Sequence, residues 1–210
     1  MEEVIVEYIS NNNQKFQRYN SWNHCYNAFT TINDEKLLSL HLGFYLASWG
    51  MYRGSSKLLE RDYLVHVEAV KIIKKYKHLR CSLEQEVAIH DLKSILNLID
   101  ELSSYYKTTH NVTPTDTLIS KIILGTLGCL PAFDRFFIDG VKEKEYCFTT
   151  LKKKSLEGLF YFFEANQLEL INIQKQYPQY PIMKIVDMYF WQIGFELSTI
   201  KIEKCQTKLL

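Results

Sequence analysis

One stretch of the sequence places a lysine and an aspartate where they can act together. Lys121 lies near the end of one predicted helix, and Asp134 lies in the first turn of the next, where the helix dipole favours a carboxylate. The glycine-containing segment 125–130 between them is predicted to be a turn that folds the two helices back on each other. We therefore expect the ammonium and the carboxylate in one cleft, where such a pair can supply a nucleophile and a counter-charge.

The segment Ser120–Arg135 reads Ser-Lys, an apolar run, a turn, Pro, an aromatic residue and Asp. This order resembles the catalytic stretch of the helix-hairpin-helix DNA glycosylases. The resemblance implies that Lys121 matches the lysine that attacks C1′ of the sugar, and that Asp134 matches the aspartate that supports an oxocarbenium-like transition state. It also implies an enzyme that extrudes a modified base and cleaves its N-glycosidic bond, in DNA repair or anti-phage defence. The family's glycine-rich, phosphate-binding hairpin has no counterpart before Lys121, since residues 110–114 contain no glycine.

Two segments rich in aromatic residues, 47–56 and 18–26, are candidates for the rest of a base-flipping site. Flat side chains stack an extruded base, and an arginine or a helix N-terminus binds the neighbouring phosphate. The alternative is that these tryptophans and tyrosines fill the core with their polar atoms hydrogen-bonded, which suits Trp22 best. The predicted substrate-binding residues are Trp49, Tyr52, Arg53, Ser55, Ser56, Trp22 and His24.

Arg53 is the predicted centre of an anion site. It lies in a bend just before a short predicted helix that Ser55 or Ser56 would cap. Backbone N–H groups, two hydroxyls and a guanidinium would then converge on one ligand, most naturally a nucleic-acid phosphate. The alternative is an ion pair between Arg53 and Glu60 or Asp62.

The spacing of arginine and histidine supports a different class of enzyme. Arg61 and His66 fit the Arg-to-His spacing of the HEPN ribonucleases, and Arg18 and His24 fit it by spacing alone. This resemblance implies metal-independent RNA cleavage by a dimer in a toxin or defence system, with Arg61 and His66 as the catalytic pair. A third hypothesis is a non-enzymatic all-α interaction module whose aromatic residues form the core.

The composition limits the remaining choices. Of 210 residues, 47% are hydrophobic and 23% charged, which excludes a disordered chain, and the net charge of +1 requires any nucleic-acid partner to meet a local basic patch. We expect nucleic acid as the partner, with DNA favoured over RNA. No nucleotide-binding or zincin motif occurs, so we expect no cofactor and no metal. An acidic start, no long apolar stretch and five widely spaced cysteines predict a cytoplasmic protein without membrane contact and with reduced thiols in its core.

Helical periodicity covers nearly the whole chain and no alternating strand pattern persists. After Asp34, one stripe is predicted to hold Leu37, Leu38, His41, Phe44, Tyr45 and Ser48. Further helices are predicted over 65–76, over 150–176 and over 181–204. Three more are predicted from their start signals: one from Ser82 to about Leu102, one from an N-cap at Thr113 to about Leu124, and one from Pro131 onward. We therefore predict one compact all-α domain over residues 1–210, with about nine or ten helices.

Overall fold

The protein is all-α. The computed structural model describes residues 1–12, 15–53, 56–80 and 91–207, and these ranges contain no strand. Single 3₁₀ turns occupy Leu58–Glu60, Tyr63–His66 and Lys77–Leu79. The α-helices are α1 (Glu2–Asn12), α2 (Asn20–Thr31), α3 (Glu35–Ser48), α4 (Val67–Lys75), α5 (Leu92–His110), α6 (Asp116–Thr126), α7 (Arg135–Glu143), α8 (Lys153–Ala165), α9 (Gln167–Gln176) and α10 (Ile182–Thr207).

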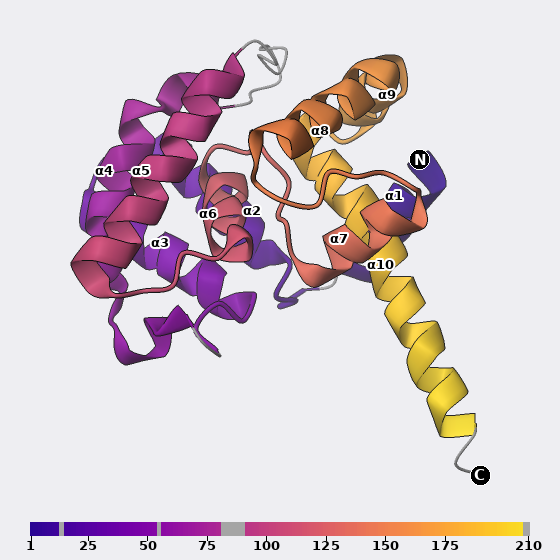
Figure 1. Ribbon diagram of the computed structural model, residues 1–210, viewed down its shortest axis with the longest axis horizontal. Coiled ribbons are helices and arrows are strands. Elements are labelled where there is room, and N and C mark those ends of the chain that lie inside the picture. Colours follow the sequence, from indigo (N-terminus) through magenta and orange to yellow (C-terminus); the bar gives the residue numbers. More distant parts are fainter. Residues whose placement is uncertain (13–14, 54–55, 81–90, 208–210) are drawn as a thin grey trace.

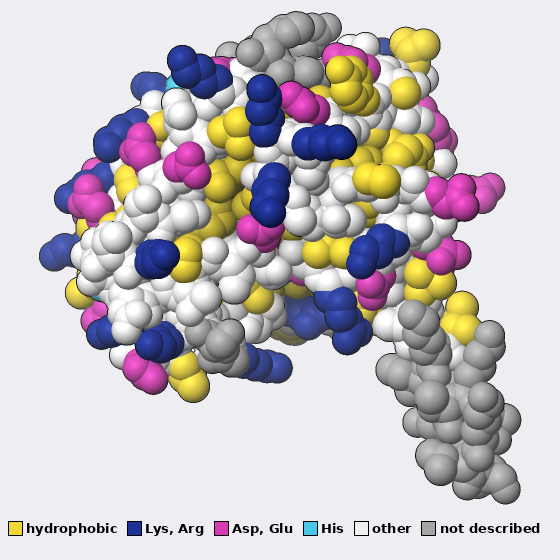
Figure 2. All heavy atoms as spheres, viewed as in Figure 1, with side chains coloured by type: hydrophobic (Ala, Val, Ile, Leu, Met, Phe, Trp, Pro, Cys, Tyr) yellow, Lys and Arg dark blue, Asp and Glu magenta, His cyan; other side chains and the backbone are white. Residues whose placement is uncertain are grey.

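Helix α6 lies in the middle of the molecule (Figure 1) and packs against α2, α3 and α5. In Figure 1, α3, α4 and α5 lie on one side of α6, whereas α1, α7 and α10 lie on the other. Every side chain of α6 from Leu118 to Thr126 is buried, which explains why its apolar residues are continuous rather than periodic. The C-terminal part of α10 extends beyond the other helices. Figure 2 shows basic and acidic side chains interspersed across the face drawn there, as the small net charge predicts.

The crossing of α7 and α10 depends on two glycines. A Cβ atom added to Gly140 would overlap the carbonyl oxygen of Phe190, and one added to Gly194 would overlap the carbonyl oxygen of Phe136. Only glycine permits such a close approach of two helix backbones. This crossing fixes the position of α7, and with it the position of Asp134 at the start of that helix.

Two predicted helix starts are corrected around the α6–α7 connection. The cap of α6 is Thr115, whose hydroxyl accepts a hydrogen bond from the Leu118 N–H, rather than Thr113. The next helix does not begin at Pro131. It begins at Arg135, because the Asp134 carboxylate accepts a hydrogen bond from the Phe137 N–H and acts as the N-cap. Helix α6 also continues through Gly125 to Thr126, so Lys121 lies in the middle of the helix. The connection to α7 covers residues 127–134 rather than the predicted 125–130.

Other boundaries confirm or revise the predictions. The helix predicted after Asp34 is confirmed, and the Asp34 carboxylate caps it by accepting a hydrogen bond from the Leu37 N–H at 2.7 Å. The stripe predicted on α3 is partly wrong, because Leu37 and Phe44 are exposed. Residues 150–176 form two helices separated at Asn166. The predicted helix start at Ser82 lies outside the described residues, and α5 begins at Leu92.

The cysteines are only partly the core thiols that the sequence suggests. Cys25 and Cys129 are buried, whereas Cys147 is exposed and is a free thiol. Burial raises the pKa of the Cys25 thiol, so this group is held in its unreactive, protonated form.

Candidate functional site

The structure brings Lys121 and Asp134 into direct contact. The Lys121 Nζ donates a hydrogen bond to Asp134 Oδ2 at 2.8 Å. Two bonds tie the connecting segment to α6: the Ser120 hydroxyl accepts from the Phe133 N–H at 2.8 Å, and the Thr117 hydroxyl donates to the Phe133 carbonyl at 2.9 Å. The position of Asp134 is therefore fixed by the backbone on both sides, as a preorganised site requires.

The pair is almost fully buried. The side chain of Lys121 is 4% exposed and that of Asp134 is 14% exposed. Removing charged groups from water costs several kcal/mol per ion, and a close partner offsets that cost. Loss of either charge would leave the other buried and unpaired, so the pair forms one electrostatic unit.

An aromatic cluster lies beside this pair. The Lys121 Nζ lies 4.7 Å from the centroid of the Trp49 ring, a cation–π contact. Trp49 packs edge-to-face against Tyr19 and Trp191, with centroid distances of 5.3 and 6.1 Å. The indole nitrogens of Trp49 and Trp191 are buried and have no hydrogen-bond partner among the described residues. Two unused donors beside a buried ion pair give the cluster spare capacity to bind a ligand with acceptor atoms.

Arg18 covers the same cluster from the turn between α1 and α2. Its guanidinium carbon lies 5.3 Å from the Tyr19 ring centroid and 5.1 Å from the Trp49 ring centroid. Trp49 is thus in contact with two cations, Arg18 and Lys121. Trp49 was predicted as a substrate-binding residue, whereas the roles of Tyr19 and Trp191 in this cluster were not, because sequence spacing gives no sign that α1, α2 and α10 meet here.

A second buried lysine–aspartate pair supports the same segment. Lys184 Nζ lies 2.7 Å from Asp187 Oδ2, and both side chains are 4% exposed. Asp187 Oδ1 accepts a hydrogen bond from the Ala132 N–H at 2.9 Å, two residues before Asp134. The prediction missed this pair, although two opposite charges three residues apart in the apolar run 182–191 were a visible signal.

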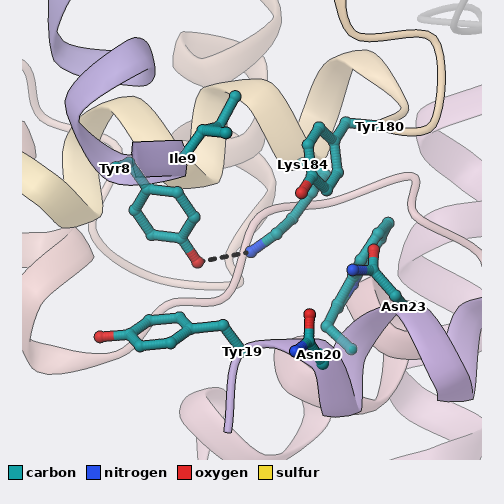
Figure 3. A pocket seen from close by; sticks show the side chains of 8 residues that line it. Tyr8, Ile9, Tyr19, Asn20, Asn23, Tyr180 and Lys184 are labelled. Atoms are coloured by element: carbon teal, nitrogen blue, oxygen red, sulfur yellow. Dashed lines mark hydrogen bonds between the residues drawn. The ribbon is translucent and has the colours of Figure 1, made fainter. Parts of the chain in front are cut away.

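A small cavity lies between Lys184 and helices α1 and α2. Figure 3 shows Lys184 and Tyr8 pointing toward each other, with Tyr19, Asn20 and Tyr180 around them. The Lys184 Nζ and the Tyr8 hydroxyl are 3.4 Å apart. Burial, followed by the charge of Asp187, raises the pKa of Tyr8, so its hydroxyl stays protonated. The cavity holds about 20 Å³, enough for one water molecule and too little for a nucleobase.

The other predicted binding residues lie in three different environments. Trp22 is buried, stacks on Tyr26 and donates its Nε1–H to the Leu124 carbonyl at 3.0 Å, which fits the core alternative. His24 is exposed on α2 and lines a groove to which neither Tyr52 nor any other residue of the 50–56 bend contributes. Tyr52 is half-buried and its hydroxyl is hydrogen-bonded to His66 Nε2 at 2.8 Å.

The structure does not build the helix N-terminus that was predicted behind Arg53. The helix there is a single 3₁₀ turn, Leu58–Glu60, so it carries little dipole. The Ser56 hydroxyl donates to the Met51 carbonyl at 2.7 Å and is therefore engaged within the bend. Ser55 lies outside the described residues, and Arg53 is exposed.

Arg61 and His66 face different surroundings. His66 is fully buried, and its two ring nitrogens contact the hydroxyls of Tyr52 and Tyr106 at 2.8 and 2.6 Å. Burial lowers the pKa of His66 to about 3. Arg61 is exposed and donates to the His110 carbonyl at 3.2 Å. A histidine that is neutral, buried and hydrogen-bonded at both nitrogens is poorly placed for acid–base work on an RNA substrate.

Two features are absent from the described residues. None of their helices is long and apolar enough to cross a membrane. They also contain no group of three or more His, Cys, Asp or Glu side chains placed to hold a metal ion. Comparison with protein-family models, with curated proteins and with solved structures finds no match for this chain.

Proposed function

We propose that this protein is a glycosylase-like enzyme that releases a modified base from DNA, with Lys121 and Asp134 at its centre. The observation that carries the proposal is the buried contact of 2.8 Å between these two side chains, next to Trp49. We further propose that it works in the cytoplasm, in DNA repair or anti-phage defence.

The chemistry follows from the charge that develops on the sugar. As the bond between C1′ and the base nitrogen breaks, its electron pair leaves with the base, and positive charge grows on the sugar ring. The Asp134 carboxylate stabilises that charge because it is held by the Phe137 N–H and needs no reorganisation. The aromatic face of Trp49 stacks the extruded base, and its size suits a planar ring.

Lys121 has two roles that can be separated by experiment. As an ammonium it keeps the Asp134 carboxylate ionised while water attacks C1′. As a neutral amine, formed when its proton passes to Asp134, it attacks C1′ itself and forms a covalent imine with the opened sugar. Only the second route leaves an adduct that borohydride reduces to a stable crosslink.

Entry to the pair requires movement of Trp49, since Lys121 is nearly inaccessible in the present arrangement. Trp49 directly follows α3 and precedes Gly50. Gly50 has φ = +77°, and a Cβ atom added to it would lie in open space, with no atom within 4 Å. A backbone with this freedom is a natural hinge for the indole.

The test is release of base from DNA duplexes that carry deaminated, alkylated or oxidised bases. Wild-type protein should release at least one class of base, and Asp134→Asn should lower the rate by about a hundredfold or more, the usual effect of removing one preorganised electrostatic group. Asp34→Asn is the matched control, because Asp34 is also a helix N-cap and asparagine caps equally well. The Asp34 variant should keep the wild-type rate.

Circular dichroism at the assay temperature shows whether each variant is folded. Borohydride trapping of wild-type and Lys121→Gln protein then identifies the covalent route. Equal rates for folded wild-type and Asp134→Asn protein would contradict the proposal, and so would a wild-type protein that releases none of these bases.

A further inference from the structure

A groove of about 580 Å³ lies between the turn at 15–18, helix α2 and helix α3. It borders the candidate site, because Arg18 lines the groove and also lies over Trp49, the ring that contacts Lys121. The groove is far larger than the cavity beside Lys184 and large enough for several atoms of a polymer chain.

The charge of this groove has one sign. Its charged lining residues are Lys15 and Arg18, and none of its lining residues is acidic. Among the described residues, no carboxylate oxygen lies within 4 Å of a side-chain nitrogen of Lys15 or Arg18. Several lysines elsewhere among these residues do pair with an acidic side chain. A cationic groove without internal counter-charges is complementary to an anionic ligand.

Two aromatic rings stand in solvent at the groove. Phe16 is 89% exposed and Phe44 is 61% exposed, and both line the groove. Phe16 also has φ = +69°, a left-handed backbone that is uncommon for a bulky residue. A strained backbone that places an apolar ring in water is unfavourable in the free protein, and stacking of a planar ligand on the ring would offset that cost.

Helix α2 contributes a row of amides to the groove wall. Asn20, Asn23 and Asn27 line it, spaced so that they share one helix face, whereas Trp22, Cys25 and Tyr26 on the other face are buried. Ser21 also lines the groove. The residue is only 3% exposed, and its hydroxyl has no hydrogen-bond partner among the described residues. This hydroxyl is therefore an unused hydrogen-bond donor in the wall of the groove.

We propose that this groove binds a single-stranded segment of DNA, with Lys15 and Arg18 on phosphates and with Phe16 and Phe44 stacked on bases. The combination of a one-signed cationic groove with exposed rings is the general means by which proteins bind single strands. The inference extends the proposed function, since it names the surface that holds the strand next to an extruded base.

The test measures binding rather than catalysis. A fluorescent strand of about 12 deoxythymidines, within the usual site size of such grooves, is titrated with protein at several salt concentrations, and anisotropy gives the affinity. Arg18→Ala should weaken binding and lower the slope of log K against log salt by about 0.7 for the lost phosphate contact. Phe44→Ala should weaken binding about fivefold or more, the effect of one lost base–aromatic stack, with the salt slope unchanged.

Matched controls exist for both variants. Arg61→Ala removes another exposed guanidinium outside the groove, and Tyr161→Ala removes a ring that is 70% exposed on α8. Both controls should bind the strand as wild-type protein does. No binding of the strand by wild-type protein would overturn the inference. An unchanged affinity in Arg18→Ala and Phe44→Ala, or equal losses in their controls, would also overturn it.

The outcome separates this inference from the proposed catalysis. Strand binding that depends on Arg18 and Phe44 without any base release supports the groove and refutes the glycosylase chemistry. Base release that Asp134→Asn abolishes, with strand binding indifferent to the groove variants, does the reverse.

Discussion

Replacement of His66 by glutamine tests whether this side chain is a buried structural group or a catalytic one. His66 is fully buried between Tyr52 and Tyr106. Burial, with a smaller contribution from nearby His110, lowers the pKa of His66 to about 3, compared with an ordinary value of 6.5. Glutamine can still donate one hydrogen bond and accept another, but it does not titrate.

The sign and size of the pH effect follow from these two pKa values. As the pH falls below 6.5, the unfolded chain takes up a proton on His66 and the folded protein does not. The folded state therefore loses about 1.4 kcal/mol for each pH unit, on the order of 5 kcal/mol by pH 3. Above pH 6.5 this group contributes no pH dependence.

Urea unfolding of wild-type and His66→Gln protein at several pH values between 4 and 8 measures this effect. The difference in unfolding free energy between the two proteins should be constant above pH 6.5 and should shift in favour of the variant as the pH falls. His24→Gln, at an exposed histidine, should follow the wild-type curve. A difference that stays constant down to pH 4 would show that His66 titrates normally, which would restore it as a candidate for the ribonuclease hypothesis.

Three further predictions concern packing and exposure. Gly140→Ala should lower the unfolding free energy by about 1–3 kcal/mol or prevent folding, because the added Cβ would overlap a carbonyl oxygen of α10. Gly158→Ala should raise the unfolding free energy by about 0.5–1 kcal/mol, because its Cβ would make only ordinary contacts. Thermal unfolding of both variants checks this. Lys184→Met should lower the unfolding free energy by about 3–5 kcal/mol, because it leaves the buried Asp187 charge unpaired. The double variant with Asp187→Leu should recover most of that loss. A single variant as stable as wild-type protein would show that the pair is not buried in solution. An aromatic disulfide reagent should modify native wild-type protein faster than Cys147→Ser, since Cys147 is an exposed free thiol; identical time courses would place this thiol inside the fold.

Much of the fold was accessible from the sequence because helix formation depends on neighbours along the chain. The periodic apolar residues predicted an all-α protein, and they placed a helix after Asp34, where the structure has α3. The pairing of Lys121 with Asp134 was also predicted, since a short connection between two helices restricts where their ends can lie. The start of α7 was misplaced because a proline suits several turn geometries, and the aspartate three residues later decided the cap.

The surroundings of the candidate site were decided by tertiary structure alone. Nothing local in the sequence shows that Trp191 on α10 meets Trp49 after α3, or that Asp187 holds the backbone of Ala132. His66 looked like half of a catalytic motif, yet packing between α5 and the segment after α3 buried it. Helix caps and apolar stripes depend on residues a few positions apart in the sequence. Burial and the contacts between charged groups depend instead on which helix faces pack together, and the packing that forms is the one that buries most apolar surface of the whole chain.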